Sequence, residues 1–137
     1  RPMGAIVGAP HGRDTAIFAT MTENLATKHC KPCEGGVAPL RPDQVEDLMR
    51  GLHADWTVSA DGLAISRRFE FPAYSRTLGF TNAVAWIAIT EGHHPDITFS
   101  YGYGVVIDRT HAIGGLSNHD FICAAKVHRM ASESLDG

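Results

Sequence analysis

The sequence is short of long hydrophobic runs, of basic residues and of cysteine. Its longest apolar stretches fall well below the roughly 18 residues that a membrane span needs, so we expect no membrane association. The formal net charge is −3 with histidine neutral, so the chain lacks the basic surplus of a typical nucleic-acid-binding protein. Cys30, Cys33 and Cys123 form an odd number without the spacing of a secreted disulfide framework, which favours a reducing compartment and predicts a cytoplasmic location.

Histidine, by contrast, is abundant, with eight in 137 residues. With 44% apolar and 20% charged residues, the composition is that of an ordinary globular protein, and the length suits one compact domain. Residues 1–20 show no clear hydrophobic period and precede a natural start at Met21, so we interpret them as a leader or extension. We therefore predict a single domain over residues 21–131 and a frayed tail over residues 132–137.

The hydrophobic period switches between helical and strand spacing along the chain. Apolar residues after Pro42 recur at helical spacing, whereas apolar and polar residues alternate over 63–71, as in a half-buried strand. The order α-β-β-α-β-β-α predicts an α+β two-layer fold, with a four-stranded antiparallel sheet and about three helices packed on one face. The predicted elements are a helix from Pro42 to about 52–54, strands over 56–59 and 63–71, a helix over 73–91, strands over 97–101 and 105–107, and a helix that begins after Ser117.

The second predicted helix leads into the most unusual motif of the chain. Apolar residues crowd its last two turns (84–91), which predicts that it is largely buried there, and Gly92 can terminate it. His93, His94 and Pro95 follow directly. The proline favours an extended backbone at His94, so the two adjacent rings are expected to point in opposite directions and to have different roles.

Three histidines, His93, His94 and His111, fall at the ends of predicted elements, and three interpretations are open. Adjacent histidines are poorly placed to chelate one metal ion, and no cysteine or carboxylate accompanies them at ligand spacing. A hydrogen bond to a backbone carbonyl explains any single histidine well, but explains three together less well. Imidazole titrates near about 6.5, so a pair in different surroundings can supply one acid and one base. Such a site suits the addition or loss of water without a cofactor.

Two further features have structural as well as chemical interpretations. Asp120 is the third residue after Ser117, so it is placed to cap the last helix, a role at least as well supported as a catalytic one. Cys30 and Cys33 form a lone C-x-x-C, a weak signal for zinc binding or redox chemistry. Cys123 is expected in the core.

The spacing of the site residues resembles that of the pterin-4a-carbinolamine dehydratases. The match reads His93-His94-Pro95, five residues, Tyr101, nine residues, His111, eight residues and Asp120. The segments CKPCEGG, APL, GFTNAVAWIA and GLSNHDFICAAKV are similar to those of bacterial-type members, and the resemblance covers about residues 22–130. It implies dehydration of a 4a-hydroxytetrahydropterin to the quinonoid dihydropterin after aromatic amino-acid hydroxylation, with the pterin as substrate and no further cofactor.

The resemblance also implies roles for individual residues. His93 and His111 would be the acid–base residues, because the leaving 4a-hydroxyl needs a proton and a ring nitrogen must lose one. Members often carry an acidic residue four positions before the first histidine, where this chain has Ile89, and Glu91 lies two positions before it instead. His119 has no role that the resemblance assigns. The implied substrate-binding residues are His94, which would hold the pterin ring, Pro95, Thr110 and Asp120.

Two other functions remain as alternatives. Some relatives act as dimerisation cofactors of a transcription factor, so the chain could be a binding module for a partner protein. A zinc protein using His29, Cys30 and Cys33 is the third hypothesis. The resemblance also implies a homodimer or homotetramer, for which the open edges of an antiparallel sheet offer a route.

Overall fold

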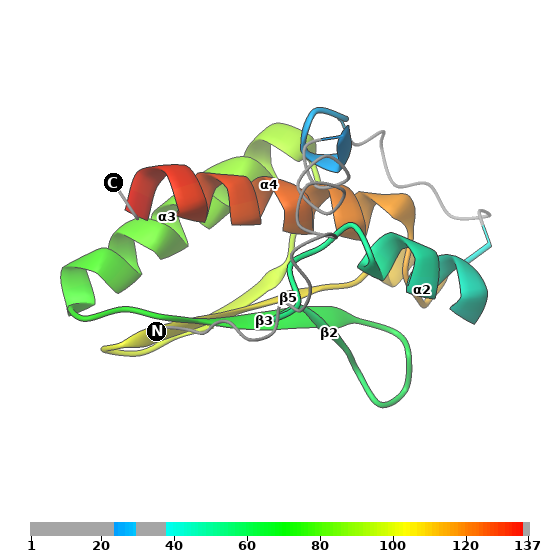
Figure 1. Cartoon of the computed structure of the whole chain (residues 1–137), viewed down its shortest axis with the longest axis horizontal. Helices are drawn as coiled ribbons and strands as arrows, with labels where there is room; N and C mark the ends of the chain where they lie inside the picture. The colour runs from blue at the N-terminus through cyan, green and yellow to red at the C-terminus, as the bar shows by residue number, and fades with distance from the viewer. Residues whose placement is uncertain (1–23, 30–37, 136–137) are drawn as a thin grey trace, which may run out of the picture.

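A computed structural model of the chain describes residues 24–29 and 38–135 (Figure 1). Four antiparallel strands form one sheet, and helices cover one of its faces, which confirms the predicted α+β two-layer fold. The predicted leader over 1–20 and the Cys30–Cys33 pair lie outside the described residues. None of the helices in the described part is both long and apolar enough to cross a membrane.

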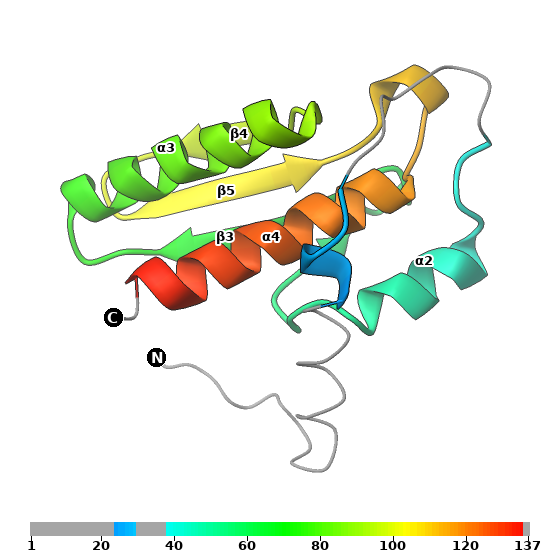
Figure 2. The ribbon, with the colours of Figure 1, turned by 90° about the horizontal axis from the view of Figure 1, so that it is seen from above.

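The strands pair in the order β2–β3–β5–β4, so β3 and β5 form the centre of the sheet and β4 is an edge strand. The two long helices, α3 and α4, run side by side above the sheet, while α2 lies at one end of the molecule (Figures 1 and 2). The elements are α2 (Pro42–Met49), β2 (Thr57–Val58), β3 (Ile65–Glu70), α3 (Tyr74–Glu91), β4 (Asp96–Phe99), β5 (Tyr103–Asp108), the 3₁₀ helix η1 (His111–Ile113) and α4 (Asn118–Leu135).

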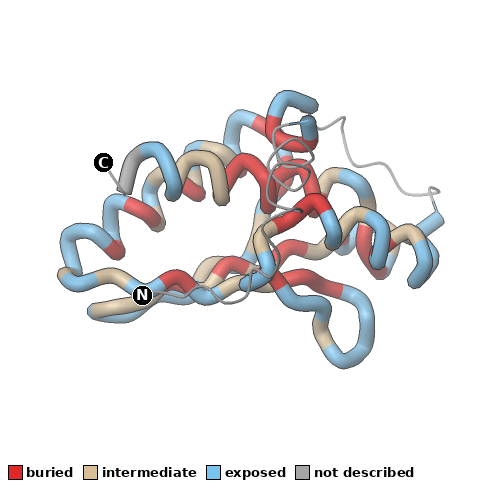
Figure 3. Tube along the Cα trace, viewed as in Figure 1, coloured by how far each residue is buried: buried red, intermediate tan, exposed pale blue. Residues whose placement is uncertain are grey.

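Strand β3 carries the alternation that the sequence predicts, but over a shorter range. Ile65 and Phe69 are buried against the helices, whereas Leu63 precedes the strand and is exposed. The Phe69 ring packs against Phe80 of α3, with 4.5 Å between the ring centroids. Buried residues concentrate between the sheet and the helices (Figure 3), so this interface is the hydrophobic core.

The prediction that α3 is largely buried near its end is wrong. Its buried residues follow a single stripe, and the exposed fractions of Trp86 and Ile89 are 68% and 67%. In a two-layer fold a helix packs against the sheet and its neighbour on one side only, so the opposite side faces solvent. Buried and exposed segments accordingly alternate along α3 (Figure 3).

The ends of two other helices differ from the prediction. Pro42 begins α2 as expected, but α2 ends at Met49 rather than at residues 52–54, and the chain turns at Arg50 and Gly51. Helix α4 continues to Leu135, past the start of the tail predicted for residues 132–137. Cys123 is buried in α4, as expected.

Candidate functional site

The chain reverses at the end of α3 and turns His93 into the protein. Gly92 has a φ of 66°, in the left-handed region that glycine adopts readily, and terminates the helix as predicted. The His93 N–H then donates to the Ala88 carbonyl at 3.2 Å, which closes the last turn. This local geometry fixes the backbone of His93, whose exposed fraction is 4%.

Asp120 caps α4, as the sequence predicts. Asp120 Oδ2 accepts a hydrogen bond from the Ser117 N–H at 2.9 Å, while Ser117 Oγ accepts one from the His119 N–H at 3.3 Å. Each satisfies a backbone donor that a helix N-terminus leaves without an intrahelical partner. The side chain of Asp120 is fully buried, so its position is fixed by these contacts.

The second oxygen of the same carboxylate holds His93. His93 Nε2 lies 2.7 Å from Asp120 Oδ1. Because an ionised carboxylate only accepts hydrogen bonds, Nε2 carries the hydrogen, and the tautomer of the ring is set by this contact. Capping and histidine binding use different oxygens of Asp120, so the two roles considered for this residue are compatible.

Thr110 completes the network around Asp120. Thr110 Oγ1 donates to Asp120 Oδ2 at 2.8 Å and lies 2.7 Å from Ser117 Oγ. Asp120 thus accepts hydrogen bonds from a ring nitrogen, a hydroxyl and a backbone N–H, which come from the end of α3, the segment after β5 and the start of α4. Charge-assisted hydrogen bonds of this kind are stronger than neutral ones, so the network is rigid.

The other predicted histidines lie at the surface. His94 is exposed although His93 is buried, in agreement with the opposite orientations predicted for the pair. His111 begins η1 and is also exposed, and Pro95 is half-buried. The structure therefore gives one buried imidazole and two exposed ones, in clearly different surroundings.

Tyr101 of the sequence motif is not part of this network. It lies in the turn between β4 and β5, at the end of the hairpin away from Pro95. Its ring stacks with that of Tyr74, with 6.2 Å between the centroids, and both are exposed. Its backbone carbonyl accepts a hydrogen bond from the Thr77 hydroxyl at 2.9 Å, which ties the hairpin to α3.

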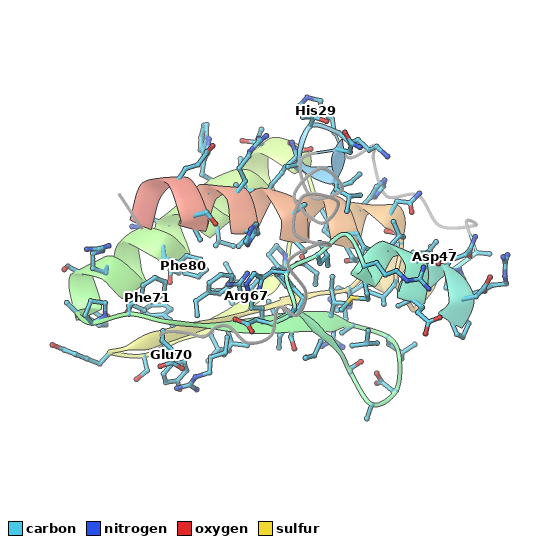
Figure 4. The ribbon with its side chains drawn as sticks, viewed as in Figure 1. His29, Asp47, Arg67, Glu70, Phe71 and Phe80 are labelled. Atoms are coloured by element: carbon cyan, nitrogen blue, oxygen red, sulfur yellow. The ribbon has the colours of Figure 1, made fainter. Side chains whose placement is uncertain are left out.

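Glu91, two positions before His93, contacts two cationic or basic side chains. Its Oε2 lies 3.2 Å from Lys126 Nζ and 3.3 Å from His29 Nδ1, so this largely buried carboxylate joins α3 to α4. Ile89, which takes the usual acidic position, is exposed on the outer side of α3. The carboxylate beside His93 comes from Asp120 instead. His29, a ligand in the zinc hypothesis, lies at the outer surface (Figure 4).

His119, which the sequence left without a role, packs against His93. The two rings meet edge to face, with 6.0 Å between centroids and an interplanar angle of 77°. His119 is half-buried, whereas His93 is buried. The ring of His119 therefore covers part of His93 on the side of α4.

Asp108 is a residue of the cluster that the sequence interpretation missed. One ligand atom each of His93, Asp108 and Asp120 lie within 4.8 Å of one another, and all three residues are buried. The available signal was an acidic residue at a core-facing position of the β5 alternation, two residues before Thr110. Within the described residues this is the group whose donor set could hold a metal ion.

The distance between His93 and Asp120 suits a hydrogen bond better than two ligands of one metal ion. Two ligands on a tetrahedral zinc ion, each about 2.1 Å from it, lie roughly 3.4 Å apart. His93 Nε2 and Asp120 Oδ1 are only 2.7 Å apart, and Asp120 Oδ2 is already bound by Thr110 and Ser117. The cluster is therefore best described as a buried imidazole hydrogen-bonded to the Asp120 carboxylate, with the Asp108 carboxyl group nearby.

A half-buried histidine, His128, has a different kind of neighbour. Arg67 Nη1 lies 3.1 Å from His128 Nδ1, and the His128 ring stacks on His53 with 5.4 Å between centroids. Arg67 occupies the space between the sheet and α4 (Figure 4). Burial and, next, the Arg67 guanidinium lower the pKa of His128 to about 4.

Comparison with curated proteins identifies close relatives. The sequence model described as pterin 4 alpha carbinolamine dehydratase matches residues 38–130. A protein of Legionella pneumophila (strain Corby) that is named for pterin-4-alpha-carbinolamine dehydratase is 44% identical over 110 residues, which is 80% of this chain and 97% of its own. A protein of Nitrosomonas eutropha with the same name is 51% identical over 104 residues, 76% of this chain and 90% of its own.

Two solved structures share the fold. A transcriptional coactivator/pterin dehydratase from Brucella melitensis aligns with a TM-score of 0.64 and 28% identity, over 68% of this chain and 98% of its own. A pterin dehydratase-like protein described as a RuBisCO assembly factor in the alpha-carboxysome aligns with a TM-score of 0.50 and 25% identity, over 58% of this chain and 92% of its own. Together with the fold and the spacing of the site residues, these matches show that the chain belongs to the pterin-4-alpha-carbinolamine dehydratase family.

Proposed function

We propose that this protein is a hydro-lyase that converts a 4a-hydroxytetrahydropterin to the quinonoid dihydropterin and water. The observation that carries the proposal is the 2.7 Å contact between His93 Nε2 and Asp120 Oδ1, made by two residues of the family's sequence pattern that are 27 positions apart. A carboxylate that fixes one ring nitrogen leaves the other nitrogen of the imidazole as the atom suited to proton exchange.

In this proposal His93 and His111 are the acid–base pair. The leaving 4a-hydroxyl takes up a proton and a ring nitrogen releases one, so the reaction needs an acid and a base but no net proton. His93 is held in the interior by Asp120, whereas His111 is exposed, and different surroundings are what separate an acid from a base. His94, which follows His93 in the chain and is exposed, would hold the pterin ring, with Pro95 and Thr110 contributing to the same pocket.

The wider setting follows from this chemistry. We propose that the reaction needs no bound cofactor, because the pterin is itself the substrate. A hydroxylase that consumes a tetrahydropterin, as aromatic amino-acid hydroxylases do, would supply the 4a-hydroxy compound, and the dehydration would recycle it. The cytoplasmic location and the absence of a nucleic-acid partner stay predictions.

The test is the rate at which freshly generated 4a-hydroxytetrahydropterin dehydrates. Wild type should accelerate the spontaneous reaction, and His93→Ala and His111→Ala should each lose about a hundredfold in kcat, the usual scale for one acid–base group. His29→Ala is the matched control, because His29 is exposed and its ring nitrogen contacts Glu91 rather than Asp120. A spontaneous rate that wild type leaves unchanged would refute the proposal.

A second candidate function is the binding of a partner protein. Trp86 and Ile89 present large apolar side chains on the outer side of α3, and the solved relatives include a protein described as a coactivator and one described as an assembly factor. The same surface would serve a homodimer or homotetramer. A stable oligomer or partner complex formed by a protein that fails to accelerate dehydration would favour this function over the first.

A further inference from the structure

We propose that Asp108 is a positioning residue of this site, whose buried carboxyl group holds a proton beside the Asp120–His93 pair. The catalytic part of this inference rests on the proposed dehydratase function. The position of Asp108 in the cluster is independent of it.

The alternation of β5 aims Asp108 at the cluster. Every second residue along the strand is buried, and the buried set continues from Val106 through Asp108 to Thr110. Asp108 is fully buried and is paired in register with Ile65 of the central strand β3. The side chain therefore points into the layer between the sheet and the helices, where His93 and Asp120 also lie.

The nearby Asp120 carboxylate bears on whether Asp108 is protonated. Two ionised carboxylates within 4.8 Å of one another in the interior would repel and would each lose hydration. Asp120 already accepts hydrogen bonds from His93, Thr110 and Ser117, so the proton that relieves the repulsion has room on Asp108 rather than on Asp120. The neutral, protonated form is then the favourable one for Asp108.

Two cationic side chains on neighbouring elements form ion pairs of their own. Arg109, the next residue, points to the opposite face of the sheet, where its NH2 lies 3.7 Å from Asp96. Lys126 of α4 is paired with Glu91. His93 and Asp120 lie in the cluster itself, and His119 of α4 packs against His93. Arg67 of β3 points to the same inner side of the sheet as Ile65 and lies 3.1 Å from His128 Nδ1.

A protonated Asp108 would act through His93 rather than on the substrate. Asp108 is fully buried, and in this proposal it does not touch the pterin but offsets the change in charge when the His93 ring gains or loses a proton. The leaving hydroxyl takes one proton and the pterin ring nitrogen returns one, so the cluster ends each turnover with the protons it began with.

Infrared spectroscopy tests the proton directly. At neutral pH the wild type should show the carbonyl stretch of a protonated carboxylic acid, and Asp108→Asn should abolish it. Asp47→Asn, which removes an exposed carboxylate on α2, should leave the band in place. A wild type without such a band at neutral pH would overturn the inference, and this readout needs neither activity nor a stable variant.

Kinetics tests the effect on the site. Asparagine has the shape of a protonated aspartate but cannot release a proton, so Asp108→Asn should fold, lower kcat about 10- to 100-fold with little change in KM, and alter the pH profile of kcat. Wild-type kcat and pH profile in Asp108→Asn would overturn the positioning role. A wild type that does not accelerate dehydration would instead refute the proposed function and, with it, the positioning role. The infrared band would still show whether Asp108 is protonated.

Discussion

Two histidines of this fold, the buried His93 and the half-buried His128, differ in the charge of the group beside them. His93 lies 2.7 Å from a carboxylate oxygen of Asp120, whereas His128 lies 3.1 Å from a guanidinium nitrogen of Arg67. The carboxylate requires a hydrogen on the His93 nitrogen that it contacts, and the guanidinium donates its own hydrogen to His128. The same side chain is therefore an acid–base candidate in one place and a neutral packing element in the other.

The largest expected effect is on catalysis. His93→Gln should lower kcat for dehydration by about a hundredfold, because it removes the imidazole that Asp120 holds. His128→Gln should change kcat by less than about twofold, since His128 is uncharged near neutral pH and belongs to the Arg67 cluster. Steady-state kinetics of the two variants measures the difference. Similar losses in both would contradict the distinction drawn between the two histidines.

The next effect is on stability. Asp120→Ala should lower the free energy of unfolding by about 3 kcal/mol, because it removes a helix cap and leaves buried donors unsatisfied. Arg67→Met keeps much of the packing over Phe69, on which the guanidinium lies at 4.2 Å, and should cost about 1 kcal/mol. Urea denaturation gives both values. Equal costs would mean that the two polar clusters support the fold to the same extent.

Acid should weaken the fold through His128. Its pKa is about 4 in the folded chain, against an ordinary value of 6.5, so between these pH values the unfolded chain binds more protons. The free energy of unfolding should therefore fall as the pH drops below about 6.5, and the loss should be complete below about 4. We expect about 2 kcal/mol from this group, less than the shift alone would give, because the ring keeps partial contact with water.

Urea denaturation of wild type and His128→Gln at about pH 7 and about pH 4.5 isolates this contribution. Glutamine does not titrate, so the variant should lose less stability on acidification than wild type does. If both proteins lose the same amount, the Arg67–His128 contact is not the source of the acid sensitivity.

The smallest expected effect on the fold is at the outer side of α3. Trp86→Ser should change the free energy of unfolding of the monomer by less than about 0.5 kcal/mol, because 68% of Trp86 is exposed. If this surface joins subunits, the substitution should instead lower the oligomeric mass measured by sedimentation. An unchanged oligomer would place the subunit contact elsewhere.

The sequence predicts the local parts of the site well. The reciprocal capping by Ser117 and Asp120 spans three residues, and the opposite orientations of His93 and His94 follow from the backbone alone. The Gly92 terminus of α3 is local in the same way. For these features, the residues that interact are also neighbours in the chain, so their spacing in the sequence is sufficient to predict the contact.

The parts that the sequence does not predict depend on contacts between distant segments. Arg67 and His128 are 61 residues apart, and Asp108 meets His93 only because β5 runs beneath the end of α3. Apolar spacing also cannot tell which side of a helix packs, so the exposure of Trp86 and Ile89 became clear only from the two-layer arrangement. Each of these contacts and exposures depends on how the helices pack on the sheet.

The double use of Asp120 gives the site a built-in reporter. The Ser117 amide donates to the same carboxylate that holds His93. Its hydrogen can exchange with deuterated water only when the hydrogen bond between Ser117 and Asp120 opens. Slow exchange at this single amide would indicate an assembled site in the absence of any pterin. Variants and conditions that loosen the His93 environment could then be ranked by one backbone resonance.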